Sequence, residues 1–313
     1  MNILLIDAFP AAMVEKLAAL GHPVRYEPDW TREQVLANVN EVDILVMNSK
    51  VNADQALLDA GPRLKMVCRA GVGMDHFDLP LLASRGVIAF NTPGANAIPV
   101  AEQAVGMLLS LMHRIARANA QVHNWQWLRE ENRGTELYGK TVGIIGHGNT
   151  GTRMSRCLSG FGCRTLAYDK YKSGFGDGMV QEASLEQIWE EADVLSLHIP
   201  LTDETLGWVN ADFLARFHKP IWLLNLSRGP ILPLEGLIAA LEDESVIAAG
   251  LDVLENERLD KLTADQRGRL ERLFQDDRVI FTPHIGGWSH ESLVRINDRI
   301  VEEIAAFVGQ RVI

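Results

Sequence analysis

Cysteine is scarce in this sequence. Three of its 313 residues are cysteines, Cys68, Cys157 and Cys163, and no two of them form a close CxxC pair. All three lie in apolar stretches, as reduced core thiols do. The pattern argues against a disulfide framework and against a metal site, and it indicates a cytoplasmic protein.

Basic residues are few as well. There are 30 Lys and Arg against 41 Asp and Glu, which gives a formal net charge of -11. A nucleic-acid groove needs clustered cations that replace the counterions of phosphates. The composition therefore argues against a nucleic-acid partner, and an anionic substrate would require a local basic pocket.

Long apolar runs are absent. No stretch is long enough to cross a bilayer, so we expect no membrane partner. The opening residues 1–7, MNILLID, have no basic segment and only a short apolar run. We therefore expect a first strand there and no signal peptide.

What the chain does have is a regular alternation of short apolar runs and longer helical patterns. Its length, with 47% hydrophobic and 23% charged residues, favours two globular domains. Alternating strands and helices are typical of parallel α/β sheets. The expected strands of the first third are 3–6, 44–47, 66–68 and 87–90, and the expected helices are 11–20, 32–39 and 54–60.

A second α/β domain is expected from about residue 141. Turn-forming residues 91–94 precede apolar residues at helical spacing over 100–120, which predict one long helix that bridges the domains. Further strands are expected at 141–145, 165–168, 194–198, 221–224, 247–251 and 279–282, and a last helix at about 291–308. Periodicity alone does not decide where that last helix packs.

A glycine-rich loop follows the expected strand 142–145. Its sequence, Gly146-His147-Gly148-Asn149-Thr150-Gly151, has the G-x-G-x-x-G spacing and opens a helix that we expect to run through residue 160. The first glycine permits a tight turn, the second lets the backbone approach a diphosphate, and the third allows close packing of helix on strand. The helix N-terminus adds amide donors for an anion. The loop predicts a dinucleotide site.

Asp169 ends the next expected strand, at the distance from the glycines where an acid binds the ribose hydroxyls. Its charge would repel the 2′-phosphate of NADP, so the sequence predicts NAD as cofactor. Lys170 and Lys172 lie nearby and weaken the discrimination against NADP.

Polar residues cluster in three later segments, 225–229, 251–257 and 282–287, at expected strand ends. Doubly wound sheets bind their ligands at such ends. Reduction of a 2-keto acid requires a cation for the carboxylate, a proton donor for the developing alkoxide, and an acid that keeps that donor charged. Arg228, His284 and Glu257 are the candidates for these roles. Taken singly, each would more often be a structural residue.

At this point the sequence strongly resembles the D-isomer-specific 2-hydroxyacid dehydrogenases, especially their phosphoglycerate dehydrogenase and hydroxypyruvate reductase branches. The resemblance covers nearly the whole chain. Its marks are the three segments above, the glycine loop, and the segments 69–75, 91–96 and 136–141.

The resemblance implies roles for individual residues. Arg228 would orient the substrate carboxylate, Glu257 would pair with His284 as the acid/base, and Asp252 would contact the nicotinamide side. The remaining implied site residues are Pro200 and Thr205 along the cofactor, and Lys50, Val72, Gly73 and Asn96 on the substrate side.

The resemblance also implies a fold of two doubly wound parallel-sheet domains. A Rossmann NAD-binding domain would span residues 96–285, and a smaller flavodoxin-like substrate domain would combine residues 1–95 with 286–313. Dimerisation through the long-helix region is usual in the family, so a homodimer is expected.

Several functional alternatives stay open at this stage. The substrate is a small D-2-hydroxy acid or 2-keto acid, with 3-phosphoglycerate and phosphohydroxypyruvate, glyoxylate, hydroxypyruvate and D-lactate as candidates. A protein that binds NAD and acts as a corepressor, without catalysis, is the alternative from another class. Because the chain stops soon after the last expected helix, we expect no regulatory extension. Trp288, and Arg258 directly after Glu257, depart from the residues usual in the family.

Overall fold

The computed structural model describes residues 1–309, and the last four residues of the predicted substrate domain, 310–313, lie outside the described residues. The chain forms two compact units. Unit 1 comprises Met1–Asn96 and the chain from Trp288 onward, and unit 2 is Ala97–Gly287. None of the helices within residues 1–309 is both long and apolar enough to cross a lipid bilayer.

Unit 1 is built on a five-stranded parallel sheet of order β2-β1-β3-β4-β5, the flavodoxin-like order. Its strands are β1 (Ile3–Leu5), β2 (Val24–Tyr26), β3 (Ile44–Met47), β4 (Met66–Arg69) and β5 (Ile88–Phe90). Its helices are α1 (Ala11–Ala18), α2 (Arg32–Asn38), α3 (Gln55–Ala60), α4 (Leu79–Ser84) and α12 (His290–Phe307).

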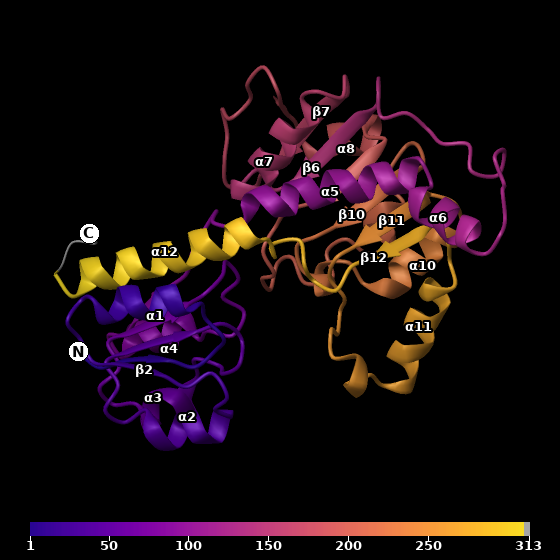
Figure 1. Ribbon diagram of the computed structural model, residues 1–313. Coiled ribbons are helices and arrows are strands. Elements are labelled where there is room, and N and C mark those ends of the chain that lie inside the picture. Colours follow the sequence, from indigo (N-terminus) through magenta and orange to yellow (C-terminus); the bar gives the residue numbers. More distant parts are fainter. Residues whose placement is uncertain (310–313) are drawn as a thin grey trace. The chain divides into compact units, whose positions relative to one another are not determined.

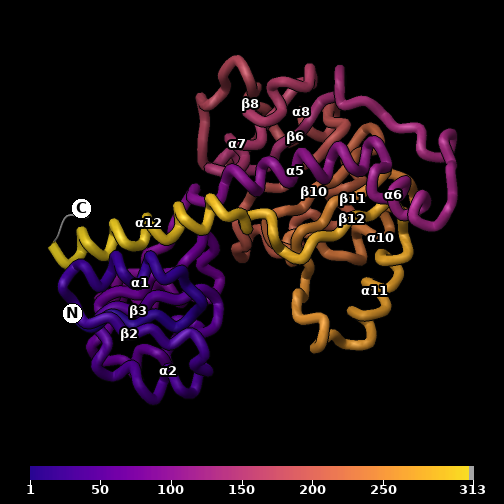
Figure 2. Tube along the Cα trace, in the orientation of Figure 1, coloured from indigo at the N-terminus to yellow at the C-terminus, as the bar shows by residue number. Residues whose placement is uncertain are grey.

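The inner strands of unit 1, β1, β3 and β4, are apolar except for Arg69 at the end of β4, because both faces of the sheet are covered. Leu4, Leu45 and Val67 pack toward α2 and α3, whereas the alternate residues Ile3 and Ile44 pack toward α1 and α12. Helix α12 therefore belongs to this unit, although it is remote from it in sequence, and it lies along α1 (Figures 1 and 2).

Unit 2 is built on a seven-stranded parallel sheet of order β12-β11-β10-β9-β6-β7-β8. The strands are β6 (Thr141–Ile145), β7 (Arg164–Tyr168), β8 (Gln181–Glu182), β9 (Val194–Leu197), β10 (Ile221–Asn225), β11 (Val246–Leu251) and β12 (Val279–Phe281). The helices are α5 (Ala97–Met112), α6 (Ile115–His123), α7 (Asn149–Leu158), α8 (Leu185–Glu191), α9 (Ala211–Leu214), α10 (Leu234–Glu242) and α11 (Ala264–Phe274), with 3₁₀ turns η1 (Gly229–Ile231) and η2 (Leu259–Lys261).

Two apolar clusters cover the two faces of this sheet. Helices α5 and α7 pack on one face around Ile144 and Leu224, and α8 to α11 pack on the other around Leu195 and Leu223. The predicted α/β class with two doubly wound parallel sheets is thus confirmed.

The predicted single helix over 100–120 is wrong. Helix α5 ends at Met112, and α6 begins at Ile115. Arg114 between them has a left-handed backbone with φ of +53°. The N–H of Thr135 donates to the carbonyl of Met112 at 2.8 Å, which satisfies one of the carbonyls at the end of α5. The segment that supplies this bond lies 23 residues further along the chain.

Candidate active site

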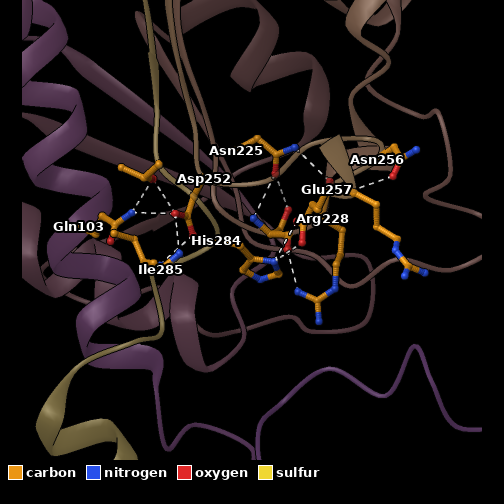
Figure 3. A network of polar contacts seen from close by, with 12 residues as sticks. Gln103, Asn225, Arg228, Asp252, Asn256, Glu257, His284 and Ile285 are labelled. Atoms are coloured by element: carbon orange, nitrogen blue, oxygen red, sulfur yellow. Dashed lines mark hydrogen bonds and ion pairs between the residues drawn. The ribbon is translucent and has the colours of Figure 1, made fainter. Parts of the chain in front are cut away.

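The strand order of unit 2 brings the three predicted catalytic residues to one edge of the sheet. Arg228 follows β10, Glu257 follows β11 and His284 follows β12, and these strands are neighbours. Because all strands are parallel, their carboxyl ends meet at that edge. In Figure 3 the three side chains extend from these adjacent loops.

The imidazole of His284 is paired with a carboxylate. Its Nδ1 lies 2.9 Å from the carboxylate of Glu257, and the two side chains are 44% and 46% exposed. An acceptor at Nδ1 fixes the tautomer and leaves Nε2 for proton exchange with a ligand. The pair therefore has the geometry of an oriented acid/base.

His284 has a left-handed backbone, with φ of +54°. Its N–H donates to the carbonyls of Asp252 at 2.8 Å and Thr282 at 3.0 Å. Such a conformation is uncommon for a residue with a side chain and persists where surrounding contacts hold it. The loop after β12 is thus fixed by its neighbours.

The side chain of Asn225, at the end of β10, holds the loop that carries Arg228. The buried Asn225 side chain donates from Nδ2 to the carbonyl of Arg228 at 3.0 Å and accepts from the N–H and Oγ of Ser227. Nη1 of Arg228 donates to the carbonyl of Ser227 at 2.7 Å. These contacts place the guanidinium group at the strand end.

Gly229 lets two of these loops touch. A Cβ at this position would lie 1.9 Å from the carbonyl carbon of Leu254, in the loop after β11. Any side chain would force that backbone away. The backbone of the loop that carries Arg228 therefore packs directly against the backbone of the loop that leads to Glu257.

Asp252 is the buried anchor of the site, with 2% of its surface exposed. Its Oδ1 accepts from Gln103 Nε2 at 2.9 Å, Thr282 Oγ1 at 2.5 Å and the N–H of Ile285 at 2.9 Å, and its Oδ2 accepts from the N–H of Gly286 at 2.8 Å (Figure 3). A buried carboxylate requires such partners. Asp252 thus holds the side chain of Thr282 before His284 and the backbone of Ile285 and Gly286 after it, and its predicted contact with the nicotinamide side stays a prediction.

Gln103 is a site residue that the sequence reasoning missed. Its Nε2 also donates to Thr282 Oγ1 at 2.8 Å, so one amide group joins α5 to the loop after β12. The signal was an amide on a helix face whose neighbours one turn away, Val100 and Met107, are apolar. A polar side chain on a buried face needs a partner.

The glycine loop has the geometry that each of its glycines predicts. Gly146 has φ of +92°, and a Cβ there would lie 2.4 Å from the carbonyl oxygen of His198. A Cβ on Gly151 would lie 2.0 Å from the carbonyl oxygen of Gly146, whereas a Cβ on Gly148 would meet nothing within 4 Å. The space over Gly148 is therefore open to a ligand.

The first turn of α7 supplies the donors of this site. Gly148 is the N-cap residue, no side chain caps the helix, and Asn149, Thr150 and Gly151 begin it. The first backbone N–H groups of a helix have no partner within it. Such donors, beside a glycine with open space over it, fit the diphosphate of a dinucleotide.

Asp169 lies at the end of β7 beside this loop. Its Oδ2 accepts from the N–H of His147 at 2.9 Å and its Oδ1 from the N–H of Tyr171 at 2.9 Å. Each carboxylate oxygen can accept a second hydrogen bond. Asp169 also lines a cavity of about 340 Å³ together with Glu182, Ser184 and Gln187, which fits the predicted ribose contact.

The loop after β9 borders the same edge. Thr205 Oγ1 donates to the carbonyl of Pro200 at 2.7 Å and accepts from the N–H of Thr202 at 2.8 Å. These bonds give the exposed loop a defined shape. Pro200 and Thr205 thus lie at the carboxyl end of the strand next to β6.

The predicted substrate-side residues lie in unit 1. The ammonium of Lys50 donates to the carbonyl of Ile6 at 2.7 Å and to that of Pro28. The carbonyl of Val72, which precedes Gly73, accepts from Asn91 Nδ2 at 2.6 Å. Asn96 is the last residue of the first segment of unit 1. Lys50, Val72, Gly73 and Asn96 thus follow strands of the smaller sheet.

Within the described residues, no group of three or more His, Cys, Asp or Glu side chains could hold a metal ion. The described part of the chain has a His–Glu pair, a guanidinium group and a glycine loop with open helix N–H groups at the carboxyl edge of one sheet. Together these features define a dinucleotide-dependent oxidoreductase.

Comparison with known proteins identifies the family. Residues 105–286 match the model of the "D-isomer specific 2-hydroxyacid dehydrogenase, NAD binding domain". The protein belongs to the D-isomer-specific 2-hydroxyacid dehydrogenase family, and its larger unit is an NAD-binding domain.

Relatives by sequence carry different substrate names. A hydroxypyruvate reductase of Thermotoga maritima is 34% identical over 278 residues, which cover 89% of each chain. A D-3-phosphoglycerate dehydrogenase of Mycobacterium tuberculosis is 34% identical over 92% of this chain but only 54% of its own length. The protein thus spans about half of the phosphoglycerate dehydrogenases that it resembles.

Solved structures share the whole architecture. A D-lactate dehydrogenase of Aquifex aeolicus, in complex with NAD and lactic acid, has a TM-score of 0.86 and 26% identity, with 98% of this chain and 96% of that chain covered. A glyoxylate reductase of Paecilomyes thermophila has a TM-score of 0.88 at 23% identity, with 99% and 97% covered, which bears on the fold alone.

Proposed function

We propose that the protein is a cytoplasmic NAD-dependent dehydrogenase that interconverts a small D-2-hydroxy acid and its 2-keto acid. The observation that carries this proposal is the 2.9 Å pair of His284 and Glu257 on the strand ends next to Arg228. NAD, held by the glycine loop and Asp169, would supply the hydride acceptor for the hydroxy acid, and NADH would supply the hydride donor for the keto acid.

The residues of the chain supply the remaining chemistry. Arg228 binds the carboxylate of the substrate through its planar fork of donors and orients the carbonyl group. In the reductive direction His284 donates a proton from Nε2 to the developing alkoxide, and in the oxidative direction it removes that proton. Glu257 accepts a hydrogen bond from Nδ1 and so holds the ring.

The glycine loop and Asp169 hold the two ends of the adenosine diphosphate. The amides of Asn149, Thr150 and Gly151 face the diphosphate, and the carboxylate of Asp169 accepts from the ribose hydroxyls. Pro200, Thr205 and Asp252 complete the cofactor side in this proposal.

We assign unit 1 as the substrate domain, with Lys50, Val72, Gly73 and Asn96 on the substrate side. The predicted domain boundaries remain part of this proposal: residues 1–95 with 286–313 for the substrate domain, and residues 96–285 for the NAD-binding domain. Hydroxypyruvate and glyoxylate are the preferred substrates, because the hydroxypyruvate reductase relative matches over most of both chains and the ammonium of Lys50 is already bound to two carbonyls.

Phosphohydroxypyruvate, the keto acid of 3-phosphoglycerate, is the second candidate. The phosphoglycerate dehydrogenases match 92% or more of this chain, which favours it. D-Lactate and pyruvate form a third pair, supported by the D-lactate dehydrogenase neighbour.

A substrate panel tests the proposal. Initial rates of NADH oxidation are measured with glyoxylate, hydroxypyruvate, pyruvate and phosphohydroxypyruvate. We expect the highest kcat/KM with hydroxypyruvate or glyoxylate. Tight NADH binding without turnover of any of these acids would overturn the proposal and favour the corepressor-like alternative.

A homodimer is part of the proposal. Apolar side chains of α6 and of the segment after it are exposed, with Trp125 at 98%, Trp127 at 79% and Val122 at 51%. An exposed apolar patch of this kind is typical of a protein contact. Light scattering after gel filtration should give twice the mass of 34.7 kDa, and replacement of both tryptophans by Ser should lower it to that of a monomer.

A further inference from the structure

Lys170 directly follows the ribose-binding candidate Asp169, and its ammonium is held by a carboxylate. Nζ of Lys170 lies 2.5 Å from Oε2 of Glu204, and the hydroxyl of Tyr171 donates to the same oxygen at 3.0 Å. This hydrogen bond raises the pKa of Lys170 and lowers the pKa of Glu204. Both groups are therefore charged at neutral pH and cancel each other.

The contact spans the cofactor edge of the sheet. Lys170 and Tyr171 follow β7, and Glu204 lies in the loop after β9. Strand β6, with the glycine loop at its end, lies between β7 and β9 in the sheet. Glu204 therefore reaches across the end of β6, on the adenosine side of the predicted dinucleotide site.

The carboxylates near Asp169 also disfavour an additional anion. The charged side chains that line the adjacent cavity are Asp169 and Glu182. Lys172 donates its ammonium to the carbonyl of His147 at 2.9 Å. Of the cations next to Asp169, Lys170 is thus the one whose charge a carboxylate neutralises.

We propose that Glu204 is a cofactor-specificity residue, which excludes the 2′-phosphate of NADP by holding Lys170. The inference rests on the proposed NAD site and deepens it. A Lys beside the ribose is a point-charge ligand for phosphate, so Asp169 followed by Lys170 would discriminate weakly. Glu204 binds the ammonium of Lys170, so that this group no longer attracts a phosphate, and it adds its own negative charge. Because the pair of Lys170 and Glu204 is exposed, it changes the affinity for the 2′-phosphate form a few-fold. Asp169 supplies the rest of the discrimination against NADP.

Equilibrium binding without catalysis tests this role. Calorimetric titrations of ADP-ribose and 2′-phospho-ADP-ribose are made with the wild type, Glu204→Gln, Lys170→Met and the double variant. In Glu204→Gln the affinity for the 2′-phosphate form should rise about fivefold relative to ADP-ribose. In the Lys170→Met background the same substitution should change that ratio less than about twofold.

Asp203→Asn is the matched control, because it removes one negative charge from the same loop without a contact to Lys170. Its affinity ratio should stay that of the wild type. An equal gain in Asp203→Asn, an equal gain in the Lys170→Met background, or no gain in Glu204→Gln would each overturn the role of Glu204. Failure of ADP-ribose to bind the wild type would overturn the dinucleotide site itself, and with it the inference.

Discussion

The two units have the same architecture but use the carboxyl ends of their strands differently. In unit 1 the ammonium of Lys50 there is bound to the carbonyls of Ile6 and Pro28, and the carboxylate of Asp7 is bound to the N–H of Asn48. In unit 2 the site includes bonds between side chains of different elements, as His284 binds Glu257 from the next strand end and Gln103 of α5 binds Asp252. In both units the carboxyl ends of the parallel strands meet at one edge. The residues at that edge determine whether it only stabilises the loops or also carries reactive groups.

The largest expected effect tests the reactive edge of unit 2. Glycine tolerates the left-handed backbone of His284, so His284→Gly removes the imidazole with little strain. We expect kcat to fall about 10³-fold, the order that general acid–base catalysis contributes. Steady-state rates with the best keto acid measure it. His218→Ala, before β10 at the opposite end of the same sheet, should keep the wild-type rate, and a kcat near normal in His284→Gly would refute the assignment.

The second effect concerns stability. Burial, and then the nearby His147, lowers the pKa of His198 from 6.5 to about 4. Because the folded-state pKa is lower, protonation favours the unfolded chain. Stability present above pH 6.5 is lost as the pH falls toward 4. Since the residue keeps some contact with solvent, we expect a loss of about 2 kcal/mol.

Urea unfolding at pH 7 and pH 4.5, followed by fluorescence, measures this loss, because Trp189 and Trp222 are buried in unit 2. His198→Gln should lose correspondingly less stability between the two pH values. An identical pH dependence in the variant would exclude His198 as the source.

The third effect concerns Gln103, whose side chain supports the loops at the carboxyl edge of unit 2. Gln103→Met removes the amide that joins α5 to Asp252 and Thr282, while the side-chain length is kept. We expect kcat to fall about tenfold with little change in the Kd for NADH, because small displacements of a catalytic group are costly. Gln55→Met is the matched control, because it removes a 2.6 Å hydrogen bond from the side-chain amide of Gln55 to Asp59 in unit 1. Equal losses in both variants would mean general destabilisation.

The smallest effect belongs to unit 1. Lys50→Met should raise the KM for the keto acid about threefold and leave kcat within about twofold, because two of the three ammonium donors of Lys50 already bind carbonyls. Saturation curves with hydroxypyruvate measure it. A loss of kcat comparable to that of His284→Gly would erase the contrast between the units.

Much of the fold follows from local sequence. The apolar runs predict the inner strands because those strands are buried on both faces, and the spacing of 146–151 predicts the cofactor loop. Strand β2 and helix α4 were missed, because each is short and β2 is partly exposed. The break between α5 and α6 carries a hydrogen bond from the N–H of Thr135, 23 residues beyond Met112, and no local pattern reveals such a contact.

The candidate site was predictable for residues with distinctive chemistry and less so for their supports. Arg228, Glu257 and His284 stand out because they occur together in segments that match the family, and the sheet order then places them after adjacent strands. Gln103 and Glu204 act through partners 149 and 34 residues away in sequence. Such long-range pairs become visible only in three dimensions.

Restoration of the missing imidazole tests the central claim most directly. In His284→Gly, turnover of the best keto acid with NADH is measured as free imidazole is added. We predict that imidazole raises the rate at least about tenfold and in proportion to its concentration, as a replaced proton donor does, while the wild type is unaffected. A variant that still binds NADH but gains no activity from imidazole would contradict the role of His284 as the acid/base.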